Sequence, residues 1–139
     1  MTKGERAEAL FKSGLNCAQS VFGAFAEDFG VDAETGAKVA CGLGGGIGRL
    51  REVCGAVSGA ALVLGLKYGP DKAVVSPRVQ DFAARFRTET GSIVCRELLE
   101  GVPKTGGVEP EARTPEYYQR RPCAELVRLA ADILERDFL

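Results

Sequence analysis

Apolar residues in this chain recur at helical spacing, and they do not alternate with the period of two that marks a half-buried strand. The clearest run occupies positions i, i+3, i+4, i+7 and i+11, namely Ala18, Val21, Phe22, Phe25 and Phe29. This spacing lines one face of an α-helix. It predicts an all-α fold, a compact bundle of about six or seven helices. No repeat or shift in composition divides the chain, so residues 1–139 are expected to form a single helical domain with a cysteine motif.

Helix start and stop signals divide the first part of the chain. Residues 5–14 form an amphipathic pattern that is closed by a glycine. Asn16 is a good N-cap for a second helix that ends at Gly30. Asp32 is expected to cap a short third helix that runs to about Ala40.

The later part of the chain is divided in the same way. Residues 53–66 are apolar on nearly every side, which predicts a buried central helix after the glycine-rich loop. Pro77 is expected to open the next helix, Ser92 to cap a short sixth one, and Pro122 to occupy the first helical position of the last. Residues 101–115 are rich in Pro and Gly without a period, which predicts a long exposed loop.

Five glycines fall within residues 42–48, so no regular element is expected there. The run does not match G-x-G-x-x-G, because Ile47 stands where the third glycine belongs, and no Gly-Lys-Ser/Thr follows. Two interpretations remain open. One is a turn that needs positive φ, which glycine adopts at little cost. The other is a nest of backbone N–H groups at Gly44, Gly45 and Gly46 that binds a thiolate, a cluster sulfide or another anion as a cofactor site.

The chain contains no histidine. Ser-His-Asp and Cys-His catalysis, HExxH zinc sites and histidine-ligated haem are therefore excluded. The five cysteines are the remaining soft ligands and the strongest nucleophiles at neutral pH. Any chemistry is expected to depend on sulfur.

Charge and hydropathy limit the partners and the compartment. Eighteen Lys and Arg residues oppose nineteen Asp and Glu residues, which argues against a general nucleic-acid binder. The longest apolar stretch is shorter than a membrane span of about 20 residues, and the first residues mix both charge signs, unlike a signal peptide. We expect a cytoplasmic protein with reduced thiols and no nucleic-acid or membrane partner. A redox partner protein is compatible with this, and a homodimer is the commonest assembly for such a chain.

Four of the five cysteines fall in the first turn of an expected helix: Cys17, Cys54, Cys95 and Cys123. A helix N-terminus favours a thiolate over a thiol, because its unpaired N–H groups carry about half a positive charge. Arg96 beside Cys95 and Arg121 near Cys123 are expected to add to this effect. Cys41 differs, because it falls at a helix end, where the dipole opposes a thiolate. The alternative is that these cysteines are small buried hydrophobes.

Cysteine- and glycine-containing motifs follow one another at residues 16–21, 42–49, 53–60, 64–69, 95–99 and Cys123. In this order they resemble a family of redox-active proteins named for a C…GCAxxG…C…C cysteine pattern. The resemblance implies that Cys17, Cys54, Cys95 and Cys123 are the family's four cysteines and that Cys41 is an addition. One local departure is that the pattern's Gly-Cys-Ala reads here as Val-Cys-Gly-Ala over residues 53–56. The family is inferred to be redox-active, comes largely from anaerobic bacteria and archaea, and includes fusions to electron-transfer modules.

Three hypotheses for the function follow. The first is a cysteine-based redox protein, a thiol oxidoreductase if it is an enzyme, in which two of the four cysteines exchange between dithiol and disulfide. In the second, Cys17, Cys54, Cys95 and Cys123 bind an iron–sulfur cluster or zinc, and the protein transfers electrons or holds a metal. The third is a helical interaction module without chemistry.

Among the four cysteines, Cys54 is expected to react first. It combines a predicted helix start with preceding glycine amides that can turn toward the sulfur. Burial of its apolar helix and the nearby Glu52 oppose ionisation, but the glycine loop is expected to open the helix start to solvent. Cys41 is the internal control.

Overall fold

The computed structural model describes residues 1–102 and 107–139, and this part of the chain contains eight α-helices, two 3-10 turns and no β-strand. The predicted all-α bundle is therefore confirmed. In chain order the elements are α1 (Lys3–Lys12), α2 (Cys17–Phe25), η1 (Ala26–Phe29), α3 (Ala33–Ala40), η2 (Cys41–Leu43), α4 (Gly55–Tyr68), α5 (Lys72–Thr90), α6 (Cys95–Leu98), α7 (Pro115–Arg120) and α8 (Cys123–Asp137).

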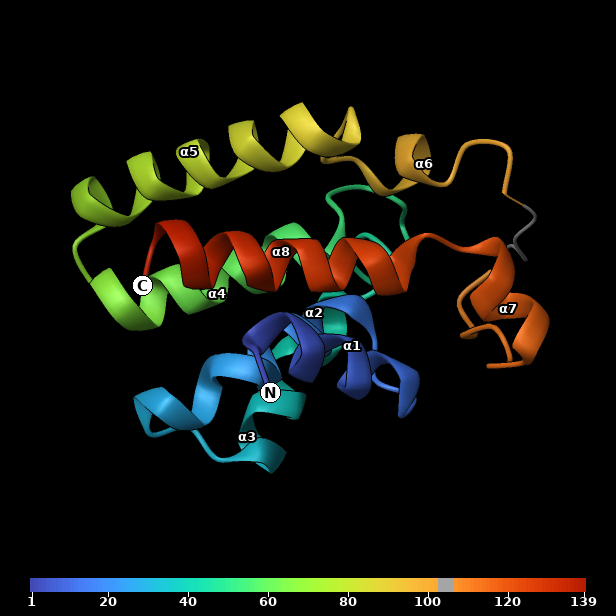
Figure 1. The fold of residues 1–139 in the computed structure, drawn as a ribbon, viewed down its shortest axis with the longest axis horizontal. Coiled ribbons are helices and arrows are strands. Elements are labelled where there is room, and N and C mark those ends of the chain that lie inside the picture. The colour runs from blue at the N-terminus through green and yellow to red at the C-terminus, as the bar shows by residue number, and fades with distance from the viewer. Residues whose placement is uncertain (103–106) are drawn as a thin grey trace.

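The last helix holds the bundle together. α8 packs against α1, α2, α4 and α5, and α4 packs against both α2 and α5 (Figure 1). Its apolar face explains this position, because α8 buries six apolar side chains: Leu126, Val127, Ala130, Ala131, Ile133 and Leu134. The largest fully buried side chains elsewhere in the core are Phe11, Phe25, Phe82, Phe86 and Leu64.

The predicted caps of α2 and α3 are confirmed. Asn16 accepts a hydrogen bond from the backbone N–H of Gln19 at 2.8 Å, and the Gln19 side chain accepts one from the backbone N–H of Asn16 at 2.9 Å. This reciprocal capping box satisfies two N–H groups that the helix leaves unpaired. Asp32 accepts from the backbone N–H of Thr35 at 2.8 Å. α2 is shorter than predicted. It ends at Phe25, and the 3-10 turn η1 follows it and is capped by Gly30.

The predicted central helix is α4, which is apolar on all sides and begins at Gly55 rather than at residue 53. The start is later because Val53 forms an isolated antiparallel bridge with Val94. α4 lies very close to α2 at Gly59, where an added Cβ would approach the Ala18 carbonyl oxygen to 2.8 Å. Small residues at this crossing bring the two helix starts into one neighbourhood.

Two predicted helix starts are wrong. α5 begins at Lys72, where Asp71 caps it by accepting from the backbone N–H of Ala73 at 2.9 Å, and Pro77 lies inside the helix. Pro77 has no backbone N–H, so α5 lacks one backbone hydrogen bond in its second turn. The other hydrogen bonds of this long helix maintain it. Ser92 does not cap α6. Its hydroxyl accepts from the backbone N–H of Val94 at 2.9 Å, and Val94 is the N-cap.

The prediction of one exposed loop over residues 101–115 holds only in part, because Pro115 is the first residue of α7 and residues 103–106 lie outside the described part of the chain. The following segment turns back toward the helix starts of the bundle (Figure 1). Pro122 is the N-cap of α8 rather than its first residue. None of the described helices is long and apolar enough to cross a membrane.

Candidate functional site

The starts of α2, α4, α6 and α8 meet around a cavity of about 420 Å³. All five cysteines line it. Cys54 is the N-cap of α4, and Cys17, Cys95 and Cys123 are the first residues of their helices, so the predicted placement at helix starts is confirmed. Cys41 lies at the end of α3, as expected, and is exposed.

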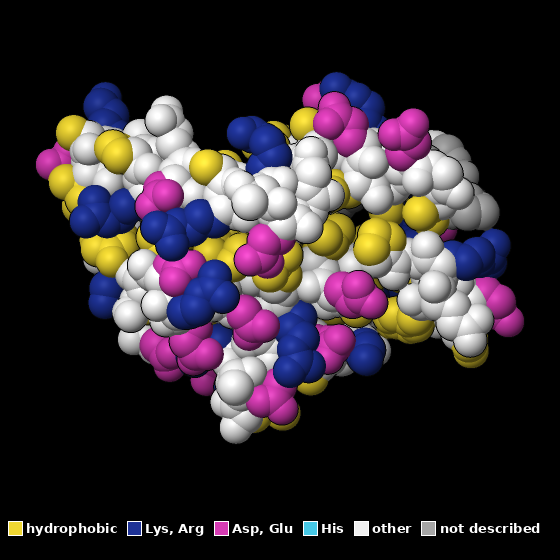
Figure 2. Space-filling view, turned by 45° about the horizontal axis from the view of Figure 1, so that its top comes forward, with side chains coloured by type: hydrophobic (Ala, Val, Ile, Leu, Met, Phe, Trp, Pro, Cys, Tyr) yellow, Lys and Arg dark blue, Asp and Glu magenta, His cyan; other side chains and the backbone are white. Residues whose placement is uncertain are grey.

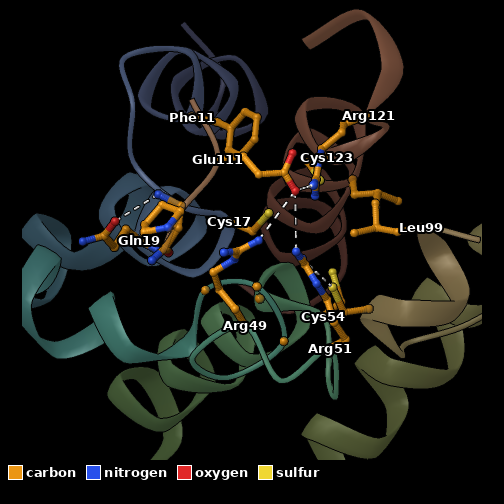
Figure 3. A pocket seen from close by; sticks show the side chains of 18 of the residues that line it. Phe11, Cys17, Gln19, Arg49, Arg51, Cys54, Leu99, Glu111, Arg121 and Cys123 are labelled. Carbon is orange, nitrogen blue, oxygen red and sulfur yellow. Dashed lines mark hydrogen bonds and ion pairs between the residues drawn. The ribbon is translucent and has the colours of Figure 1, made fainter. Parts of the chain in front are cut away.

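The Cys17 and Cys123 side chains are neighbours at the cavity, and a hydrogen bond between their sulfurs is the main cause of the opposite shifts in their pKa values. Figure 3 shows the two side chains reaching the cavity from different helices. This hydrogen bond and the charges of Arg121 and Arg113 lower the pKa of Cys123 to about 7, although burial opposes its ionisation. The same hydrogen bond and burial raise the pKa of Cys17 well above its ordinary value. The pair therefore combines a sulfur that ionises near neutral pH with one that stays protonated.

Cys54 and Cys95 are brought together by the short bridge between Val53 and Val94. The backbone N–H of Cys95 donates to the carbonyl of Glu52 at 2.6 Å. Both cysteines are buried. The four helix-start cysteines thus lie near one another, since Cys17 and Cys54 are each influenced by the charges of Cys95 and Cys123.

Cys54 was expected to react first because glycine amides and the helix dipole would favour its ionisation, and this basis for the prediction is wrong. Burial raises the pKa of Cys54 to about 12, and the backbone N–H groups of Ala56 and Val57 only partly offset this. The glycine-rich segment does not open this helix start to solvent, since Cys54 is 4% exposed. Desolvation therefore outweighs the helix dipole at Cys54, and the easily ionised thiol is Cys123.

The cation beside Cys95 also differs from the prediction. Arg96 pairs with Glu52 at 3.0 Å on the surface, where both side chains are 55% exposed. Arg51 is the residue whose Nη1 donates to the Cys95 Sγ at 3.8 Å. Position in the sequence next to a cysteine was therefore a poor guide, because adjacent residues leave a helix start in different directions.

A group of arginines around one carboxylate was not predicted from the sequence. Glu111 accepts ion pairs from Arg49 at 3.6 Å, from Arg51 at 3.8 Å and from Arg121. Figure 3 shows these three guanidinium groups converging on the Glu111 carboxylate beside the cysteines. Two arginines directly after the glycines were the available signal, but Glu111 is distant in sequence and its placement depends on the tertiary fold.

The glycine-rich segment follows a left-handed path. Residues 45–49 are consecutive positions with φ between 53° and 73°, and the Arg51 N–H and Glu52 N–H close the turn on the carbonyls of Gly45 and Gly46, each at 3.0 Å. This confirms the interpretation that the segment needs positive φ. Gly44, Gly45 and Gly46 also line the cavity, but their role in binding a cofactor or anion stays a prediction. The turn directs Arg49 and Arg51 toward the cavity (Figure 3).

Within residues 1–102 and 107–139, no group of three or more His, Cys, Asp or Glu side chains is arranged to hold a metal ion. Tetrahedral zinc and the common iron–sulfur clusters need four sulfur ligands around one centre. The alternative in which Cys17, Cys54, Cys95 and Cys123 hold a metal or cluster stays a prediction.

Comparison with known proteins agrees with the cysteine pattern. A protein of Archaeoglobus fulgidus described as "Uncharacterized protein" is 29% identical over 134 residues, which span 92% of this chain and 87% of that protein. No solved structure matches the chain. The family described as "Putative redox-active protein (C_GCAxxG_C_C)" matches residues 15–136, which include all four helix-start cysteines. Because this match covers most of its length, the chain belongs to the C_GCAxxG_C_C family.

Proposed function

We propose that this protein carries out thiol–disulfide exchange, with Cys123 as the attacking thiolate and Cys17 as the second thiol. The observation that supports this proposal is the hydrogen-bonded pair that these two cysteines form at the starts of α8 and α2, facing a cavity. The family's description as redox-active supports the same chemical class.

Cys123 has the environment of a nucleophile. The optimum attacking thiol has a pKa near the ambient pH, because it is then substantially ionised without losing its nucleophilicity. The Cys17 hydrogen bond and Arg121 stabilise the Cys123 thiolate, whose pKa is lowered to about 7. In the free protein Cys17 is protonated and serves as the donor of that hydrogen bond.

The exchange proceeds in two steps that conserve atoms and electrons. The Cys123 thiolate attacks one sulfur of a substrate disulfide, the S–S bond breaks, and one half leaves as a thiolate. The resulting mixed disulfide no longer holds the negative charge that raised the pKa of Cys17. Cys17 then loses its proton, attacks the Cys123 sulfur and releases the second half. The substrate gains two electrons and leaves as two thiolates, which take up the proton from Cys17 and any further proton from solvent, and the protein retains a Cys17–Cys123 disulfide.

This scheme requires reduced cysteines at its start. All five are free thiols in the structure. A reducing compartment such as the cytoplasm maintains that state. Cys54 stays protonated through the neutral range, since its pKa is raised to about 12, so it is not the attacking group.

The test uses 5,5′-dithiobis(2-nitrobenzoate) at one equivalent, in a Cys41→Ser background that removes the exposed thiol. The scheme predicts about two equivalents of released thionitrobenzoate, because Cys17 displaces the group first bound to Cys123. Cys17→Ser is expected to release about one equivalent and to retain the other as a stable mixed disulfide on Cys123. Peptide mass spectrometry identifies the residue that holds it.

Two results would contradict the assignment. One is a Cys123→Ser variant that reacts at the rate of the parent protein. The other is a Cys17→Ser variant that still releases the second equivalent, since another cysteine would then be the second thiol. Far-UV circular dichroism of both variants checks that they are folded.

A further inference from the structure

The cavity beside the cysteines holds an excess of positive charge. Its charged lining residues in the described part of the chain are four arginines and one glutamate: Arg49, Arg51, Arg113, Arg121 and Glu111. One carboxylate therefore faces four guanidinium groups. Charges in a concave site with low-dielectric walls attract the opposite ion much more strongly than on an open surface.

The arginines are held in place by the fold. Arg49, Arg51 and Arg121 have side chains that are only 11%, 16% and 5% exposed. Arg113 donates to the backbone carbonyls of Phe11 at 3.0 Å and Leu15 at 2.9 Å, and its guanidinium lies 4.4 Å from the centre of the Phe11 ring. These partners of Arg113 are neutral, so they fix the side chain and leave its charge in the cavity.

Three helices of ordinary length add to the same potential. α2, α4 and α8 all begin at the cavity, and the N-terminus of each helix has a partial positive charge. The cavity is large enough for a small molecule, because ligand pockets range from about 300 to about 1,000 Å³. Glu111 shows which chemistry suits the arginines, since a carboxylate is what three of them already bind.

We infer that the substrate of this site is a low-molecular-weight disulfide that bears a carboxylate, and that Arg49, Arg51 and Arg121 recognise this group. The inference rests on the exchange reaction proposed above and names its substrate class. The carboxylate is held at the arginines while the Cys123 thiolate attacks the disulfide sulfur. The S–S bond breaks, one half departs as a carboxylate-bearing thiolate, and Cys17 releases the other half as before.

The first test compares two chromogenic disulfides, 5,5′-dithiobis(2-nitrobenzoate), which carries carboxylates, and 4,4′-dithiodipyridine, which is neutral. Stopped-flow rates in the Cys41→Ser background are each divided by the rate of the uncharged thiol N-acetylcysteinamide with the same disulfide. The normalised preference for the carboxylate probe is expected to be about 10-fold or more at low salt. It is expected to fall severalfold as the ionic strength rises from about 0.05 to about 0.5 M.

Matched variants assign the effect to the cavity. Arg49→Gln is expected to lower the preference about threefold or more, whereas Arg49→Lys, which keeps the charge, retains most of it. Arg49 is chosen because its ion pair reaches Glu111 and not a sulfur. Arg120→Gln on α7, outside the cavity lining, is the control and is expected to match the parent.

Competition on the unmutated cavity gives a readout that does not depend on folding of a variant. Benzoate is expected to slow the reaction with the carboxylate probe, and its neutral counterpart benzamide is not. Equal normalised rates for both disulfides, with no effect of benzoate, would overturn the inference and leave the exchange reaction standing. Failure of Cys123 to react with either disulfide would instead overturn the proposed function.

Discussion

At the scale of single residues, the four helix-start cysteines show that position alone does not decide acidity. Cys54 and Cys123 both begin long helices, and both are buried. Yet burial raises the pKa of Cys54, while the hydrogen bond from Cys17 and the charge of Arg121 lower that of Cys123. The difference lies in side chains supplied by other elements. A thiolate in this fold depends on a donor and a cation as well as on a helix dipole.

The raised pKa of Cys54 predicts how stability depends on pH. An unfolded thiol ionises near pH 8.5, whereas Cys54 in the folded protein stays protonated up to about pH 12. Its contribution to stability is therefore complete below pH 8.5 and is lost as the pH rises, by about 1.4 kcal/mol per pH unit. Urea unfolding between about pH 8.5 and 10 is expected to show a shallower fall in the free energy of unfolding for Cys54→Ala than for the parent.

The control for this experiment is Val57→Ala, which removes buried apolar atoms one turn into α4 and no titrating group. It is expected to lower stability at every pH without changing the slope. A slope for Cys54→Ala equal to that of the parent would show that Cys54 ionises freely in the folded protein.

At the scale of elements, the crossing of α2 and α4 depends on a residue without a side chain. Gly59→Ala would place a Cβ 2.8 Å from the Ala18 carbonyl oxygen and 3.1 Å from the Ala18 Cα, so the backbone of α2 must move. We expect a loss of about 1–3 kcal/mol in the free energy of unfolding, as for other overpacked contacts. Because the crossing also sets the distance between Cys17 and the start of α4, the reactivity of the thiols is expected to change with it.

Gly65→Ala is the matched control, since it lies in the same helix and its added Cβ meets no atom within 4 Å. It is expected to stabilise the protein by up to about 1 kcal/mol through helix propensity. Urea unfolding of both variants measures the difference. Equal effects of the two substitutions would show that α2 and α4 can separate at no cost.

The features of the helices that the sequence predicted correctly depend on residues close together in the chain. Asn16 and Asp32 were recognised as N-caps because a cap acts on the N–H group three residues ahead of it. The placement of four cysteines at helix starts followed from the same signals. α7 was missed because it is short and lies among prolines and glycines, and the start of α5 was missed because a proline inside a helix resembles one at its beginning.

The remaining parts of the site are set by contacts between distant segments. Arg49 and Arg51 meet Glu111 only in the folded protein, where the segment before α7 lies beside the glycine-rich segment. The choice of Arg51 rather than Arg96 as the partner of Cys95 depends on the bridge between residues 53 and 94. No spacing rule in the sequence encodes such contacts. The cysteines of the site were therefore predictable, and their charged surroundings were not.

At the scale of the whole molecule, charge is distributed very differently inside and outside. Lys and Arg side chains are interspersed with Asp and Glu side chains over the face shown in Figure 2, in keeping with a net charge of −1. The described lining of the cavity, in contrast, contains four arginines and one glutamate. A mixed exterior gives little long-range attraction, so an anion is selected mainly after it has reached the cavity.

A disulfide between Cys17 and Cys123 would join α2 near one end of the chain to α8 at the other. Closing a loop of roughly 100 residues stabilises a folded protein by up to about 4.7 kcal/mol through the unfolded chain. The oxidised protein is therefore expected to unfold at a higher urea concentration than the reduced one. Cys17→Ser treated with the same oxidant is the control and should show no such increase.

A lower urea midpoint after oxidation would contradict this prediction, because the bond would then strain the contact between the two helices. Peptide mapping of the oxidised sample establishes which cysteines are joined. The prediction applies to the molecule as a whole, since most of the chain, residues 18–122, lies between the two cysteines.

The path of residues 45–49 can also be viewed in terms of chirality. L-amino acids disfavour left-handed backbone conformations, and D-amino acids, as their mirror images, prefer them. The path of residues 45–49 is left-handed. Ribosomal synthesis supplies no D-residues, and glycine is its only achiral building block. The glycines at positions 45, 46 and 48 therefore adopt backbone angles that D-residues would prefer. Their role in this segment is to permit a defined left-handed path and not to make the backbone flexible. A chemically synthesised chain with D-alanine at position 48 should accommodate this turn more readily than one with L-alanine.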